Sequence, residues 1–194
     1  IAGQYPSRYM LFVFPLNESK AGSIKAVNHM GTGRLQTIRE EWNPRYYQIV
    51  KKFGEMSLSG EGYETPSNQC WPSGVPYVFW NFGLQIFQQE DKLTLIYLHD
   101  HEVRHVRLNG KHPEEVMPSW YGDSVGDYEG DTLVIVTKNF NGLTKLDTNG
   151  HPHSQSLRLI ERYRRVNHDT MEFQATFEDP EIYTKPLVGN LMTL

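Results

Sequence analysis

The sequence is nearly free of cysteine, because Cys70 is the single one among 194 residues. An internal disulfide is therefore excluded, and with it a small fold stapled by disulfides. An excess of positive charge is also missing: 19 Lys and Arg residues face 23 Asp and Glu residues, which gives a net charge of −4. That balance argues against nucleic acid as the main partner. Long apolar runs are absent too, so we expect no membrane span.

The signatures of several common sites are also missing. The chain has no Gly-x-Ser-x-Gly elbow, no P-loop and no dinucleotide-binding fingerprint. It shows no basic segment followed by an apolar stretch and a cleavage site, and it opens with Ile1. Localisation therefore stays open between a cytoplasmic chain and a mature exported product.

The length of 194 residues suits one domain with a full core, and we predict a single domain over residues 1–194. Residues 1–80 look irregular and partly helical, since apolar residues recur at helical steps from Leu35 to Phe53. Residues 82–187 read as an antiparallel β-meander. We expect the N-terminal part to pack on the sheet as helical decoration.

Seven strands are predicted in the second part, because β-rich runs alternate with short turns of Asn, Asp and Gly. They cover residues 84–89, 93–99, 103–108, 125–128, 132–138, 155–166 and 171–178. Residues 9–14 are a candidate eighth strand. Open sheet edges promote aggregation, so a sheet of this size is expected to close. The predicted fold is mainly β, a lipocalin-like antiparallel β-barrel of about eight strands; a strongly curved open sheet packed on the helices is the alternative.

The alternation of side chains predicts which faces look inward. Residues 171, 173, 175 and 177 are apolar and alternate with polar ones, so they should face the interior. In the partner strand the inward row includes Glu161, a carboxylate among apolar residues. The apolar count of the strand 103–108 favours Arg104 inward, toward Glu161. Glu161 is then either a general base in a water-poor interior or one half of a structural ion pair.

Histidines form the densest polar cluster, at His99, His101 and His105. His-x-His spacing on a strand can present two imidazoles to one metal ion, so a metal here is an alternative to our expectation of no cofactor. Acid–base catalysis and simple contact with water are the other roles considered for these histidines. Cys70 lacks an adjacent activating base, which predicts a packed and inert thiol.

Several blocks of sequence together resemble one family. The most specific is Pro118–Val134, which has the pattern PxWxGxSxGxxEGDTLV; the others lie at 70–76, 153–154, 161–165, 179–180 and 183–186. They are similar to a family of largely uncharacterised bacterial proteins, often exported. The resemblance covers roughly residues 68–187. It implies a lipocalin-like β-barrel and a periplasmic or secreted location, and it implies no activity. His105 and Asp123 depart from the family's usual residues.

Three functions are compatible with such a barrel. The first is a cofactor-independent enzyme that holds a hydrophobic, aromatic or polycyclic small molecule and performs lyase, isomerase or cyclase chemistry. The second is a non-catalytic protein that binds an apolar small molecule, and the third is a structural module with a filled interior. The sequence does not determine the oligomeric state, although aromatics in 8–14 and 77–87 are compatible with a homo-oligomer.

The residues predicted to serve the enzyme fall into two groups. The catalytic group contains Glu161 as general base and His99 or His101 as proton shuttle. It also contains Arg104 as a stabiliser of an anion or oxyanion and Tyr97 as a hydrogen-bond donor. The substrate-binding group contains Trp120, Tyr121, Tyr163, His105, Asp123 and Phe173, with Tyr163 also a hydrogen donor.

Overall fold

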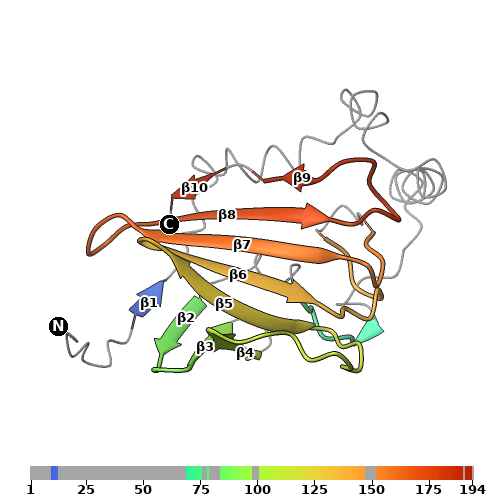
Figure 1. Ribbon diagram of the computed structural model, residues 1–194, viewed down its shortest axis with the longest axis horizontal. Helices are drawn as coiled ribbons and strands as arrows, with labels where there is room; N and C mark the ends of the chain where they lie inside the picture. Colours follow the sequence, from blue (N-terminus) through green and yellow to red (C-terminus); the bar gives the residue numbers. More distant parts are fainter. Residues whose placement is uncertain are drawn as a thin grey trace.

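The structure, a computed structural model, describes residues 10–12, 69–75, 78, 84–97, 101–146, 152–189 and 191–193. Within these ranges the chain forms one ten-stranded sheet (Figure 1). The strands are β1 (Met10–Phe12), β2 (Leu84–Gln88), β3 (Lys92–Tyr97), β4 (Val103–Leu108), β5 (Asp123–Glu129), β6 (Thr132–Lys138), β7 (Arg158–Arg165), β8 (Met171–Glu178), β9 (Leu187–Val188) and β10 (Met192–Thr193). The mainly β prediction is confirmed, and residues 10–12 supply the eighth strand expected near the N-terminus.

Four neighbouring pairs, β2–β3, β3–β4, β5–β6 and β7–β8, are joined by short turns of five residues or fewer, as the sequence predicts. Between β5 and β6, Glu129 pairs with Thr132, so a two-residue turn of Gly130 and Asp131 closes the hairpin. Gly130 has a φ of +66°, a conformation that glycine adopts without steric cost. Between β7 and β8 the pairing runs from Arg158–Glu178 to Arg165–Met171, over the full length of both strands.

One pairing corrects the predicted meander, because β4 and β5 run parallel. Parallel neighbours cannot be joined by a tight turn, so the chain must travel back along the strand before it pairs again. Residues 109–122 make this return. The turn residues Asn109 and Gly110 signalled the end of β4 but not the direction of the next strand.

The sheet curls into a half-barrel and does not close among the described strands (Figure 1). β1 pairs with β2, and β9 and β10 both pair with β8, so none of the described pairings joins the two ends. The terminal strands contain only two or three residues, too few to seal a barrel along its length. The curved open sheet is the better description, and the predicted helix over 35–53 lies outside the described residues.

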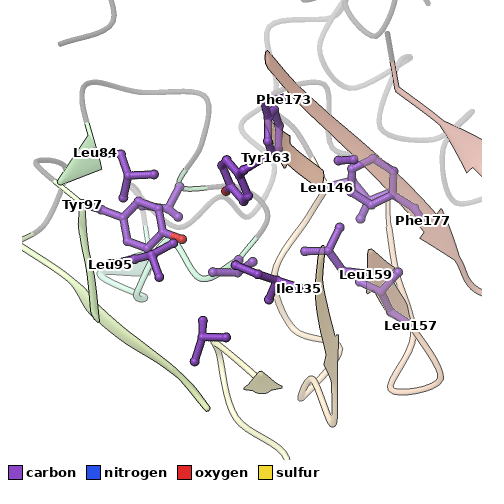
Figure 2. Close-up of a cluster of buried hydrophobic side chains, with 14 of the residues drawn as sticks. Leu84, Leu95, Tyr97, Ile135, Leu146, Leu157, Leu159, Tyr163, Phe173 and Phe177 are labelled. Carbon is purple, nitrogen blue, oxygen red and sulfur yellow. The ribbon is translucent and has the colours of Figure 1, made fainter. Parts of the chain in front are cut away.

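The inward-facing rows are confirmed by burial. Glu161 is fully buried and lies between Leu159 and Tyr163 in the inner row of β7. Figure 2 shows side chains from β2 and β3 pointing toward those of β7 and β8, with Ile135 of β6 between them. Among the described residues, the largest apolar side chains that are fully buried are Leu93, Leu95, Ile135, Phe140, Leu157, Leu159 and Ile182. Burial of this apolar face drives the sheet to curl around it.

Candidate functional site

A buried polar cluster lies in the middle of this apolar face. The register explains how it assembles: Glu161 pairs with Ile135, and two residues along β6, Thr137 pairs with Ser124. Ser124 in turn pairs with Val106 of β4, two residues from Arg104. Alternate residues on paired strands share a face, so β4, β5, β6 and β7 each contribute one polar side chain to the same patch.

Arg104 is the centre of the cluster, and all five of its N–H groups have acceptors. Nη1 donates to Glu161 Oε1 at 3.1 Å and Nη2 donates to Glu161 Oε2 at 2.5 Å, so the ion pair is bidentate. The other three N–H groups donate to Tyr97 at 3.2 Å, to Ser124 at 2.9 Å and to Thr137 at 2.5 Å. The side chains of Arg104 and Glu161 are 1% and 0% exposed. A buried ion pair of this kind is tolerated only with such complete hydrogen bonding.

Two tyrosines flank the ion pair. The Tyr163 hydroxyl donates to Glu161 Oε1 at 2.9 Å, and the Tyr97 hydroxyl accepts from Arg104. Tyr163 also packs on Phe173, with ring centroids 4.8 Å apart. Tyr163 therefore connects the polar cluster to the aromatic and aliphatic side chains that surround it.

The electrostatics of the cluster favour neutral phenols beside one ion pair. Burial, reinforced by the nearby Glu161 carboxylate, raises the pKa of Tyr163 well above its ordinary value. Burial likewise raises the pKa of Tyr97. Burial disfavours the charged guanidinium of Arg104, but the adjacent Glu161 outweighs it and raises the pKa of Arg104. The net charge of the cluster is thus zero, with Arg104 and Glu161 cancelling each other.

This geometry bears on the base role predicted for Glu161. A general base needs an oxygen lone pair directed at the proton that it removes, within hydrogen-bond reach. Both Glu161 oxygens already accept hydrogen bonds, and Oε1 accepts two. The arrangement suits a fixed polar anchor better than a base, although the catalytic role itself stays a prediction.

The predicted histidine cluster does not join this site. His99 lies outside the described residues, while His101 and His105 are exposed. His101 has a φ of +54° in the turn before β4, and His105 contacts Thr94 at 3.3 Å on the other face of the sheet from Arg104. Within the described ranges no three His, Cys, Asp or Glu side chains are grouped as metal ligands.

Asp123 belongs to a second, more exposed cluster. It accepts two hydrogen bonds from Arg107, at 2.9 and 2.8 Å, and Nδ1 of His112 lies 2.7 Å from its carboxylate. Burial raises its pKa, but these two partners outweigh burial and hold it below the ordinary value. This cluster ties the long connection back to β4, and the sequence analysis did not predict it.

Trp120 and Tyr121 lie in the connection that precedes β5. Trp120 packs on Trp71, with ring centroids 5.7 Å apart, and its carbonyl accepts from the Val75 backbone at 3.2 Å. Tyr121 is half-buried against the core, and its buried hydroxyl has no partner in the described structure. Neither residue has a hydrogen bond to the Arg104 cluster in the described part of the chain.

The prediction of a packed Cys70 thiol is wrong, because Cys70 is exposed and has a φ of +55°. His153, in contrast, is 4% exposed, with its ring edge-on to Phe140. Its Nδ1 donates to the carbonyl of Ser154 at 3.0 Å, which leaves Nε2 buried without a partner. Burial lowers the pKa of His153, despite the opposing effect of that carbonyl.

Comparison with known proteins corrects the family resemblance. The family model that matches is described as Carbamoyltransferase C-terminus and covers residues 1–63. It is not a lipocalin family, so the resemblance drawn from the Pro118–Val134 block is wrong. None of the cluster residues lies in the matched range. No curated protein and no solved structure matches the chain.

A transmembrane helix was not expected. Among the described residues, no helix has the length and apolar character needed to cross a bilayer.

Proposed function

We propose that this protein binds an apolar small molecule against the inner face of its curled sheet, without converting it chemically. The observation that carries the proposal is the composition of that face. Among the described residues, apolar and aromatic side chains surround the hydrogen-bonded polar cluster centred on Arg104. Binding sites for small molecules have this character: mostly apolar walls with a few fixed polar groups that orient the ligand.

The two phenols are the proposed points of orientation. Tyr97 and Tyr163 stay protonated because burial raises their pKa values, so each presents an uncharged hydroxyl. Because the Tyr163 hydroxyl already donates its proton to Glu161, a ligand hydroxyl would donate to a phenol oxygen while the ligand's apolar body contacts Phe173, Leu95 and Ile135.

The test is titration with an uncharged fluorescent probe, N-phenyl-1-naphthylamine, followed by displacement with decanol. We expect a saturable rise in fluorescence at one probe per chain, reversed by decanol. Ala175→Phe enlarges an inner-face side chain next to Glu161 and should weaken probe binding at least tenfold. Gln174→Phe makes the matched change on the opposite face and should leave binding unchanged. Equal effects of the two variants would contradict an inner-face site.

A cofactor-independent acid–base enzyme is the second candidate, with lyase, isomerase or cyclase chemistry. It is favoured by the concentration of four titratable side chains in mutual contact: Tyr97, Arg104, Glu161 and Tyr163. Incubation of 2-dodecanone with the protein in D₂O separates the candidates. An enzyme of this class should speed exchange of the protons next to the carbonyl, whereas a binding protein should leave the rate at that of buffer alone.

A further inference from the structure

The Arg104–Glu161 ion pair also bears on which ligands the inner face accepts. A guanidinium is the usual protein group for a carboxylate, because its planar fork matches two carboxylate oxygens. Here that fork is occupied by Glu161, through Nη1–Oε1 and Nη2–Oε2. The remaining N–H groups are taken by Tyr97, Ser124 and Thr137. Arg104 therefore has no N–H group left for an acidic ligand.

Charge leads to the same conclusion. Among the described residues, the buried charged side chains are Arg104, Glu161 and Asp179. Asp179, directly after β8, accepts hydrogen bonds from the backbone N–H and the hydroxyl of Ser154, which precedes β7. None of these described hydrogen bonds joins Asp179 to the Arg104 cluster. An ionised ligand that reached the cluster would bring an uncompensated negative charge to a water-poor site whose own two charges already cancel. An uncharged ligand brings no such cost.

We propose that Glu161 is a specificity-determining residue, an internal counter-ion that reserves the inner face for uncharged apolar molecules and excludes fatty-acid anions. The ligand class that follows comprises long-chain alcohols, ketones and esters. This inference rests on the proposed binding function, and it adds that the same site selects by charge.

The first experiment compares decanol, methyl decanoate and decanoate as competitors of N-phenyl-1-naphthylamine on the wild-type protein at pH 8. We expect the alcohol and the ester to displace the probe at concentrations at least tenfold lower than decanoate. Equal displacement by decanoate would overturn the inference while leaving the binding function intact. Absence of probe and decanol binding would instead overturn the binding function, and the inference with it.

The second experiment assigns the selectivity to Glu161, since a charged chain is also better hydrated. In Glu161→Gln the guanidinium of Arg104 loses its counter-ion, so the ratio of decanoate affinity to decanol affinity should rise at least tenfold. The double variant Arg104→Met/Glu161→Gln removes the cation and should lose that gain. An unchanged ratio in Glu161→Gln contradicts the proposal.

Folding of Glu161→Gln provides a further readout, because an uncompensated buried charge destabilises the native state. If the variant unfolds alone, decanoate should restore its folded circular dichroism spectrum and raise its melting temperature more than decanol does at the same concentration. A variant that stays unfolded at saturating decanoate, while the double variant folds, would also overturn the proposal.

Discussion

Removal of one partner of the Arg104–Glu161 pair should destabilise the protein far more than removal of both. Arg104→Met leaves the Glu161 carboxylate buried with Tyr163 as its remaining hydrogen-bond donor among the contacts described above. Glu161→Leu leaves a buried guanidinium without its counter-ion. Breaking a fully buried ion pair typically costs about 3–5 kcal/mol, because the remaining charge is neither hydrated nor paired. For a chain of this size that corresponds to a fall in melting temperature of roughly 10 °C.

The double variant Arg104→Met/Glu161→Leu should recover most of that loss, since apolar side chains of similar volume suit this interior. A double-mutant cycle by urea unfolding should then give a coupling energy of about 3 kcal/mol or more. Arg158→Met is the matched surface control: its partner Glu178 lies at 2.5 Å, but the side chains are 39% and 35% exposed. It should cost less than about 1 kcal/mol.

Two results would refute this reasoning. One is a loss below about 1 kcal/mol for each single variant, which would mean that water reaches the pair. The other is additivity, with the double variant as unstable as the sum of the two single variants. Either result would show that the inner face is not the water-poor environment on which the proposed function depends.

Three further predictions concern other parts of the chain. Gly122→Ala should destabilise the protein by about 2 kcal/mol or more, because φ is +64° and a Cβ would collide with the Lys138 carbonyl; Gly130→Ala, at φ +66° with open space, should cost only about 1 kcal/mol in the same denaturation assay. Stability should fall as pH drops below 6.5, the ordinary pKa of His153, because burial lowers its pKa in the native state; His153→Gln should flatten that part of the stability profile. Asp123→Asn should remove stability that the wild type keeps above pH 3.8 and loses as pH falls further, since Arg107 and His112 lower the native pKa of Asp123; an unchanged acid profile would contradict this.

The sheet could be predicted from the sequence to the extent that its strands show strict alternation and short turns. In β8 the buried residues Met171, Phe173, Ala175 and Phe177 alternate with half-buried polar ones, and this pattern specifies both the strand and its inner face. The same logic placed Glu161 inside and directed Arg104 toward it. Local pattern was sufficient in these cases because each strand buries one face against the same core.

The parts that were missed depend on contacts between distant segments. The parallel pairing of β4 and β5 follows from the route of residues 109–122, which carry no strand or helix periodicity. Ser124 and Thr137 complete the acceptors of Arg104, yet small hydroxyl residues in a strand give no signal of burial until the register is known. The burial of His153 could not be predicted for the same reason, since its ring packs against Phe140, which lies 13 positions away in the sequence.

The most direct test of the account is to locate a bound ligand. A diazirine-bearing analogue of decanol can be cross-linked to the protein with light and the labelled residues identified by mass spectrometry. We predict labels on inner-face residues of β3, β7 and β8, near Tyr97, Tyr163 and Phe173, with label lost when excess decanol competes. Labels confined to the outer face, or labelling that excess decanol does not reduce, would contradict a ligand site on the inner face of the curled sheet.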